Sequence, residues 1–344
     1  MGDQICDDPV WLDFLWLEVT NRCNLQCVHC YSDSHPKSGY RDLLSRDHYA
    51  RVMEDAYGLG CRKVQLIGGE PQLSPHFGHL LEKAKHIGYE FVEVFSNLTH
   101  LSDETIDFAA RNDVAFATSV YSHDPAVHDN VTTVRSSHER TVRNLGKLVE
   151  RGVTVRASVI AIDQDKDEID RTKDFLERMG VHSVRVGAVR EFGRAQDVMS
   201  QDARLSGLCG HCWRGRLCVS PDGTAYPCVM AREWPVGNVM EEKLSQILQG
   251  DPLERMRQTI REEVWLPRAQ SHADRSKICG PSKTRAPQPY CSPDVGPCGP
   301  GDCPQGGSDP TPACEPEACP QSCEPDACPQ SCEPNPLCEP DFEE

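Results

Sequence analysis

The sequence predicts an α/β protein whose parallel sheet curves into a partial barrel. Short apolar segments alternate with amphipathic segments from about residue 12 to residue 190. Glycines follow most of the amphipathic segments, as they do at helix ends. Parallel strands need crossover connections, which are usually helices of right-handed sense. Six strands with helices between them therefore predict a partial (βα)6 barrel of the TIM type.

Each element follows from its apolar pattern. The six strands are expected at residues 12–19, 63–67, 91–95, 114–120, 153–162 and 184–189. Three helices are expected at residues 46–58, 103–111 and 169–179. Two more helices contain one-sided apolar sets, which are Phe77, Leu80, Leu81 and Ala84, and Val142, Leu145 and Val149. Four of the helices are expected to end near Gly60, Gly88, Gly152 and Gly180.

The charge balance excludes some classes of partner. The chain of 344 residues has 36 Lys and Arg against 53 Asp and Glu, a net charge of −17, which argues against binding nucleic acid through phosphates. Asp13 and Glu18 interrupt the most apolar stretch near the start, which is far shorter than the about 20 residues that span a bilayer. The first eight residues lack the basic start of a signal peptide. We therefore expect a cytoplasmic protein without nucleic-acid or membrane partners.

Nineteen cysteines are distributed unevenly along the chain. None lies between residues 62 and 208, whereas fourteen lie after residue 208. An odd count, tight clusters and no secretory signal favour metal binding in a reducing cytosol over a disulfide framework.

The cysteines with the strongest signal follow the first predicted strand. Cys23, Cys27 and Cys30 form a C-x3-C-x2-C loop. Three thiolates can hold three irons of a cubane cluster and leave the fourth iron without a protein ligand. A structural zinc ion needs four ligands, which this spacing does not supply.

This loop resembles the signature of the radical S-adenosylmethionine (radical SAM) superfamily, in which C-x3-C-x-aromatic-C follows the first strand of a partial barrel. A second match is Gly68-Gly69-Glu70-Pro71, at the end of the second predicted strand. It resembles the family segment that binds the amino group of SAM through its backbone and Glu. The resemblance implies an enzyme with a [4Fe–4S] cluster and SAM as cofactors. The cluster reduces SAM, and the resulting 5′-deoxyadenosyl radical abstracts hydrogen from the substrate.

The resemblance implies four further contacts with SAM. His29 stands where a ring packs near the adenine, and Asn97 resembles a residue that meets the ribose or carboxylate. Ser119 and Arg156 resemble ribose and carboxylate contacts, and a guanidinium can hold a carboxylate through two hydrogen bonds. The alternatives are a strand-end cap for Asn97 and a surface salt bridge for Arg156. Residues 119–122 read SVYS where the family often has Ser-x-Asp-Gly, so the contacts of that Asp are not carried over.

A second cysteine region resembles the SPASM extension of the family, or its shorter form, twitch. It contains Cys209, Cys212, Cys218 and Cys228. A hairpin turned by residues 221–223 is expected between the last two. The SPASM-like spacing would use Cys212, Cys218 and Cys228 with a remote ligand, and the twitch-like spacing would use Cys209, Cys212 and Cys228. We predict that all four bind one auxiliary [4Fe–4S] cluster, with a zinc site as the alternative.

The end of the chain has a different composition. A full SPASM domain has a second cluster motif, and the spacing of Cys279, Cys291, Cys298 and Cys303 departs from it. Whether these cysteines bind a second auxiliary cluster is therefore left open. From Asp309 onward there are ten acidic residues, no basic one, and a CEPEACPQS-like repeat with a period of nine. This composition predicts disorder unless a metal orders the segment. The expected domains are the barrel at 1–195, the SPASM/twitch-like region at 196–305 and the tail at 306–344.

The resemblance implies a radical SAM enzyme that modifies a ribosomally made peptide by crosslinking, thioether formation or epimerisation. The alternatives are a radical SAM enzyme acting on a sugar, nucleoside or amino acid, and a non-catalytic iron-binding protein. The expected electron donor is a flavodoxin or ferredoxin. Because about eleven residues precede the first predicted strand, a separate leader-peptide-binding protein is an expected partner. The sequence assigns no catalytic acid, base or hydrogen donor.

Overall fold

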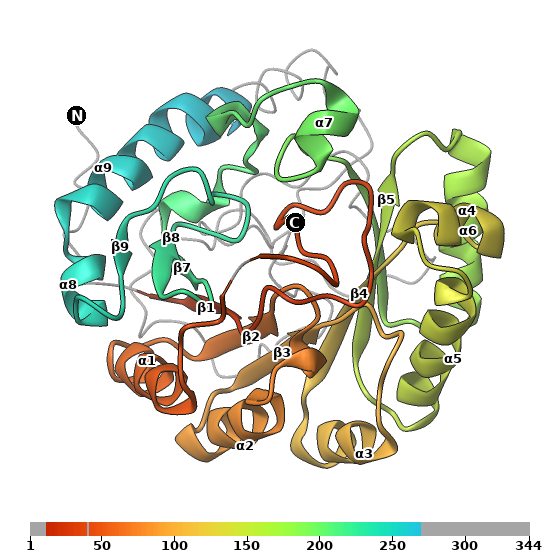
Figure 1. The fold of residues 1–344 in the computed structure, drawn as a ribbon, viewed down its shortest axis with the longest axis horizontal. Coiled ribbons are helices and arrows are strands. Elements are labelled where there is room, and N and C mark those ends of the chain that lie inside the picture. The colour runs from red at the N-terminus through yellow and green to blue at the C-terminus, as the bar shows by residue number, and fades with distance from the viewer. Residues whose placement is uncertain (1–11, 40, 270–344) are drawn as a thin grey trace, which may run out of the picture. The chain divides into compact units, whose positions relative to one another are not determined.

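The computed structural model describes residues 12–39 and 41–269. Within these ranges a single sheet has the strand order β6-β5-β4-β3-β2-β1-β7-β8-β9, and Figure 1 shows helices along its outer side. The neighbours from β6 to β7 in this order pair in parallel, while β7, β8 and β9 pair antiparallel. The predicted α/β fold with a parallel sheet is therefore confirmed.

The strands are β1 (Phe14–Glu18), β2 (Lys63–Ile67), β3 (Phe91–Phe95), β4 (Ala115–Val120), β5 (Val155–Ala161), β6 (Ser183–Ala188), β7 (Arg216–Val219), β8 (Thr224–Tyr226) and β9 (Gly237–Asn238). The α-helices are α1 (Arg46–Gly58), α2 (Phe77–Ile87), α3 (Asp103–Asn112), α4 (Pro125–Thr132), α5 (Ser137–Glu150), α6 (Lys166–Arg178), α7 (Ala195–Met199), α8 (Leu244–Leu248) and α9 (Asp251–Ile260). Short helical turns are η1 (Pro71–Leu73), η2 (Leu205–Gly207), η3 (His211–Trp213) and η4 (Arg261–Trp265). The six predicted strands and five predicted helices are confirmed, with small changes at their ends.

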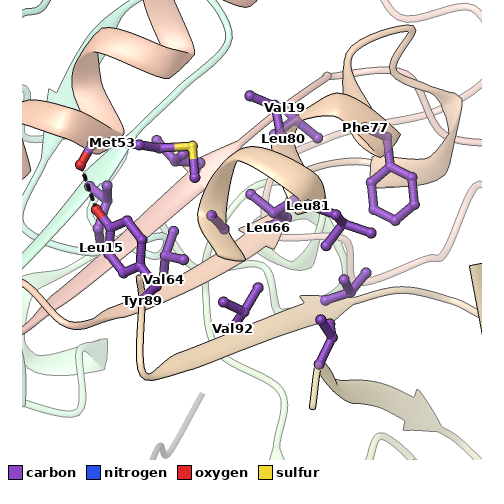
Figure 2. Close-up of a cluster of buried hydrophobic side chains, with 14 of the residues drawn as sticks. Leu15, Val19, Met53, Val64, Leu66, Phe77, Leu80, Leu81, Tyr89 and Val92 are labelled. Carbon is purple, nitrogen blue, oxygen red and sulfur yellow. Dashed lines mark hydrogen bonds between the residues drawn. The ribbon is translucent and has the colours of Figure 1, made fainter. Parts of the chain in front are cut away.

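The hydrophobic core lies between the sheet and the helices outside it. Figure 2 shows part of this core, which includes Leu15, Leu66 and Leu80, and all three are fully buried. The Tyr89 hydroxyl donates to the backbone oxygen of Met53 at 2.8 Å within this layer. Burying each such leucine contributes about 1.5–3 kcal/mol, so this layer stabilises the sheet that carries the site.

The opposite face of the sheet carries both aromatic and polar side chains. Because successive strand residues point to opposite faces, Trp16 and Glu18 face away from the core residues Leu15 and Leu17. In the register of the sheet, Trp16 lies between Cys218 on β7 and Gln65 on β2. Gln65 in turn lies beside Glu93 on β3. The inside of the barrel therefore carries buried polar side chains next to a cysteine of the second cysteine region.

The structure differs from the predictions at α4 and α5. The sequence analysis did not include α4, although Asp124 caps it by accepting from Ala126 N at 2.7 Å and Pro125 is its first residue. On α5, Leu145 is buried as expected, but Val142 and Val149 are only partly buried. The buried face is instead partly polar and includes His138, Thr141 and Asn144. Thr141 and Asn144 on this face donate hydrogen bonds to backbone carbonyl oxygens of the turn after β3.

The second cysteine region continues the sheet of the barrel. Strand β7 pairs with β1, and the predicted hairpin between Cys218 and Cys228 is confirmed as β7 and β8. Its turn places Gly223 at a φ of 89°, where other residues are strained. Residues Met1–Pro267 group into one compact unit, so the division at residue 195 stays a prediction. The cysteines from Cys279 onward and the repeat tail lie outside the described residues.

Among the helices of the described ranges, none has the length and apolar composition needed to cross a membrane.

Candidate active site

The loop with Cys23, Cys27 and Cys30 follows β1 and is held by α4. Gln26 N donates to Thr132 O at 3.2 Å, and Val28 N donates to Val131 O at 3.0 Å. These bonds join the middle of the loop to the last turn of α4. The helix that the sequence analysis omitted therefore fixes the backbone between the cysteines.

A second support for the loop comes from the segment after β6. Arg194 donates to Cys27 O at 2.9 Å, to Asp33 Oδ1 at 2.7 Å and to Ser34 O at 2.8 Å. The preceding Gly193 has a φ of 55°, and a Cβ there would lie 2.4 Å from the carbonyl oxygens of Cys30 and Tyr31. The sequence analysis did not identify either residue, because a contact across 160 residues leaves no local pattern.

The three thiols form a desolvated group. Burial raises the pKa of the Cys23 thiol well above its ordinary value and raises the pKa of Cys27 to about 12. The charges of Glu70, Cys27 and Cys30 also raise the pKa of Cys23. No group of three or more His, Cys, Asp or Glu among residues 12–39 and 41–269 is placed to hold a single metal ion. A set of three free thiols, with Cys23 buried and Cys27 and Cys30 partly buried, fits an iron–sulfur cluster, which binds and deprotonates cysteines.

The two glycines after β2 pack directly on the cysteine loop. Gly69 N donates to Thr20 O and Glu70 N donates to Arg22 O, both at 2.8 Å. A Cβ on Gly68 would lie 2.4 Å from Thr20 O, and a Cβ on Gly69 would lie 2.4 Å from Arg22 O. The glycines are thus required for the close approach of two backbone segments.

The carboxylate of Glu70 is completely buried and bonded within the chain. It accepts from Ser96 Oγ at 2.9 Å, from Asn97 N at 2.8 Å and from the side chain of Gln72 at 3.2 Å. Burial raises the pKa of Glu70 to about 7 despite these bonds. The carboxylate therefore ties Pro71 and η1 to the end of β3, and its predicted contact with the amino group of SAM stays a prediction.

Asn97 lies beside the cysteine loop, as its predicted role requires. Its Nδ2 is 2.8 Å from Asn24 Oδ1 and 3.7 Å from Cys23 Sγ. Its Oδ1 accepts from Thr99 N at 2.9 Å. The amide thus links the end of β3 to the loop, and a contact with SAM stays a prediction.

Arg156 forms an ion pair inside the barrel. Its Nε and Nη2 donate to the two carboxylate oxygens of Glu93 at 2.8 and 2.9 Å. The Glu93 side chain is 2% exposed and also accepts from Gln65. The alternative of a salt bridge is therefore present, but it is buried and not on the surface, and the contact of Arg156 with the SAM carboxylate stays a prediction. Ser119 lies in β4 on the inner face, opposite Ser158, and its contact with SAM stays a prediction.

His29 packs against the residue that replaces the family's usual Asp. The ring centroids of His29 and Tyr121 are 5.0 Å apart in an edge-to-face arrangement. Burial lowers the pKa of His29 to about 4, so the ring is neutral at pH 7. Its buried Nδ1 has no hydrogen-bond partner in the described part of the chain. A neutral ring with an unused nitrogen fits the predicted place beside an adenine, which stays a prediction.

The structure also brings the second set of cysteines together. Burial and the charge of Cys228 raise the pKa of Cys209. A thiol hydrogen bond between Cys212 and Cys228 raises the pKa of Cys212 and lowers that of Cys228. Cys218 interacts with Cys228 and with Glu18. Cys212 and Cys228 are thus in contact, and the four-ligand site stays a prediction.

A buried ion pair joins the two cysteine regions. Arg232 Nη2 donates to Glu18 Oε2 at 2.7 Å and to Asn21 Oδ1 at 3.1 Å. The other oxygen of Glu18 accepts from the Tyr31 hydroxyl at 3.1 Å. Burial raises the pKa of Glu18, and the charge of Arg232 opposes this effect. The sequence analysis did not identify this network, because its members are 13 to 214 residues apart.

The fold and the cysteine sites define the class of protein. Residues 17–177 match the family model of the radical SAM superfamily, and residues 201–279 match the model of the iron–sulfur cluster-binding SPASM domain. The chain therefore carries a radical SAM domain followed by a SPASM domain. These two domains imply a [4Fe–4S] cluster, SAM and auxiliary cluster binding as its cofactor chemistry.

Individual relatives are more distant. The antilisterial bacteriocin subtilosin biosynthesis protein AlbA of Bacillus subtilis is 22% identical over 263 residues, 67% of this chain and 58% of AlbA. GTP 3′,8-cyclase of Desulforamulus reducens is 26% identical over 204 residues, 55% of this chain and 62% of the cyclase. The structure of Streptococcus suis SuiB bound to S-adenosylmethionine superposes with a TM-score of 0.60 at 16% identity, covering 72% of this chain and 68% of SuiB. The chain therefore spans about three fifths of AlbA and of the cyclase.

Proposed function

We propose that this protein modifies a ribosomally made peptide by radical SAM chemistry. When bound, the reduced cluster supplies the electron that splits SAM into methionine and a 5′-deoxyadenosyl radical, which takes a hydrogen atom from the peptide. The observation that carries the enzymology is the group of three free thiols on the loop after β1, one buried and two partly buried, against which Gly68 and Gly69 pack. The similarity to AlbA, named for bacteriocin biosynthesis, supports a peptide as the substrate.

The residues of the chain contribute positioning. Arg194 and the end of α4 fix the loop that presents the thiols. Cys23 is buried, and Cys27 and Cys30 are partly buried, so the loop limits the access of water to the sulfurs. The neutral His29 ring offers a flat apolar surface at the same place.

A small-molecule substrate is the second candidate. It is favoured by the similarity to GTP 3′,8-cyclase, which covers 55% of this chain. Both candidates use the same barrel and the same SAM chemistry, so an assay of SAM cleavage does not distinguish them. Identifying the modified product does.

The test uses the full-length protein, reconstituted anaerobically with iron and sulfide. With SAM and dithionite we expect 5′-deoxyadenosine, measured by liquid chromatography and mass spectrometry. Cys23→Ala should abolish it, while Cys61→Ala should not, because Cys61 is buried away from the loop and contacts Asp13 and Lys63.

The peptide substrate is tested with precursor peptides encoded next to the gene, supplied with flavodoxin or ferredoxin and with any encoded leader-binding protein. A crosslink or thioether lowers the peptide mass by two hydrogens, and epimerisation in deuterated water adds one deuterium. Turnover of GTP or another small molecule with no change in any peptide would refute the peptide proposal and leave the radical SAM assignment intact.

A further inference from the structure

Each of the three loop thiols has a polar side chain beside it. Asn97 Nδ2 lies 3.7 Å from Cys23 Sγ, the Tyr121 hydroxyl lies 3.8 Å from Cys27 Sγ, and Ser32 Oγ lies 3.4 Å from Cys30 Sγ. The three donors come from the end of β3, the end of β4 and the loop itself. Each sulfur thus has one hydrogen-bond donor beside it, and the three donors come from three separate segments. This distribution indicates that the fold positions the donors toward the sulfurs.

The donor groups are held in place by other contacts. The Tyr121 ring lies between His29 and His128, with centroid distances of 5.0 and 5.1 Å. Ser32 Oγ is 2.9 Å from Ser34 Oγ, and both serines are buried. If Ser34 donates to Ser32, the Ser32 proton points to Cys30, because a metal-bound thiolate has no proton to give.

Tyr121 stands in the segment where the sequence departs from the family's usual Ser-x-Asp-Gly. A phenol donates a hydrogen bond and carries no charge at neutral pH, whereas an ionised carboxylate only accepts. At this position the chain thus places a donor toward Cys27 in place of an anion.

We propose that Tyr121 and Ser32 are positioning residues that raise the reduction potential of the cluster at Cys23, Cys27 and Cys30 by hydrogen bonding to the sulfurs of Cys27 and Cys30. Hydrogen bonds to cluster sulfurs withdraw electron density and stabilise the reduced, more negative state. Asn97 completes the arrangement at Cys23, but its predicted contact with SAM makes it a poor probe.

This inference rests on the assignment of the three cysteines as cluster ligands, but not on the identity of the substrate. Its test therefore measures the potential of the reconstituted full-length protein without SAM or peptide. The cluster is titrated with dithionite and followed by electron paramagnetic resonance. A variant with Cys23, Cys27 and Cys30 all replaced by Ala supplies the spectrum of the auxiliary site for subtraction. Failure of the peptide proposal would leave this measurement unaffected.

The main variant is Tyr121→Phe, which removes only the hydroxyl. We expect the equilibrium constant for one-electron reduction to fall about tenfold, which is a shift of about 59 mV to lower potential. The matched control is Tyr89→Phe, which loses a buried hydroxyl bonded to Met53 O in the core shown in Figure 2. Its potential should equal that of the unmodified protein. An unchanged potential in Tyr121→Phe with a full complement of iron, or an equal shift in both variants, would overturn the proposal for Tyr121.

Ser32→Ala provides a second and independent comparison. It should shift the potential in the same direction, and it decides the proposal if Tyr121→Phe does not take up the cluster. The control is Ser38→Ala in the same loop, whose hydroxyl donates to Asn21 O at 3.1 Å and touches no thiol. A potential that is the same in Ser32→Ala and Ser38→Ala would overturn the role of Ser32.

Discussion

Arg232 of the SPASM domain donates to the completely buried carboxylate of Glu18 at the end of β1. Removing one partner of a buried ion pair leaves an uncompensated charge and costs about 3–5 kcal/mol. We expect Arg232→Met to lower the free energy of unfolding by this amount in denaturant titrations. Glu18→Gln combined with Arg232→Met should recover part of the loss. The control is Arg143→Met, at an exposed pair with Glu139, which should change stability by no more than about 0.5 kcal/mol.

The second prediction concerns Arg156 and Glu93 inside the barrel. If their ion pair is structural, Arg156→Met should destabilise the protein strongly, and adding Glu93→Gln should restore part of the stability. The double variant should then bind SAM with a Kd within about threefold of the unmodified protein, measured by equilibrium dialysis, because a change of this size is below 1 kcal/mol. A loss of SAM affinity greater than about tenfold in the folded double variant would instead assign Arg156 to the SAM carboxylate.

The third prediction is a pH dependence at Glu70. Burial raises its pKa to about 7 in the folded protein, above the ordinary value of 4.5. Its favourable contribution is therefore fully present below pH 4.5 and is lost as the pH rises through 7. Compared with Glu70→Gln, the unmodified protein should lose about 3 kcal/mol of unfolding free energy between pH 5 and pH 8. Parallel stability curves for the two proteins would refute this assignment.

The fourth prediction separates two glycines. Gly69→Ala places a Cβ 2.4 Å from Arg22 O and should displace the cysteine loop. We expect the reconstituted variant to retain several-fold less iron after gel filtration. Gly78→Ala in α2 meets nothing within 4 Å and should leave iron binding unchanged while stabilising the helix by about 0.5–1 kcal/mol. Equal iron contents in both variants would show that the close approach at Gly69 is dispensable.

The fifth prediction tests the ligands of the auxiliary cluster. If all four cysteines bind it, Cys218→Ala and Cys209→Ala should each remove its paramagnetic signal and its share of the bound iron. A twitch-like site would lose its cluster in Cys209→Ala but keep it in Cys218→Ala. Cys61→Ala, at a buried cysteine outside both sites, is the control.

The barrel strands and most of their helices were predictable because each has a local apolar pattern. The strand at Lys63–Ile67 and the helix at Arg46–Gly58 have the bounds expected from the sequence. The buried face of α5 was not predictable, because Thr141 and Asn144 are selected by carbonyl groups of the turn after β3. The spacing of apolar residues predicts which apolar side chains are buried, but it does not indicate a hydrogen bond to a turn distant in the sequence.

In the candidate site, too, local motifs were predictable and contacts between distant residues were not. The cysteine spacing and the glycine pair could be read from short segments of the sequence. Arg194 and Arg232 could not, because each contacts the cysteine loop from more than 150 residues away. The ion-pair partner of Arg156 could not be predicted either, since the sequence does not show that Glu93 lies beside it on the next strand but one.

The pairing of β1 with β7 makes the order of synthesis matter. Strand β1 is complete at Glu18, but its second neighbour is not made until Val219. A nascent chain that has finished the first six strands therefore carries an open backbone edge beside its cysteines, and open edges invite association with other chains. Truncation before β7 should give an insoluble product, and a cell producing this protein must protect that edge until translation reaches the hairpin.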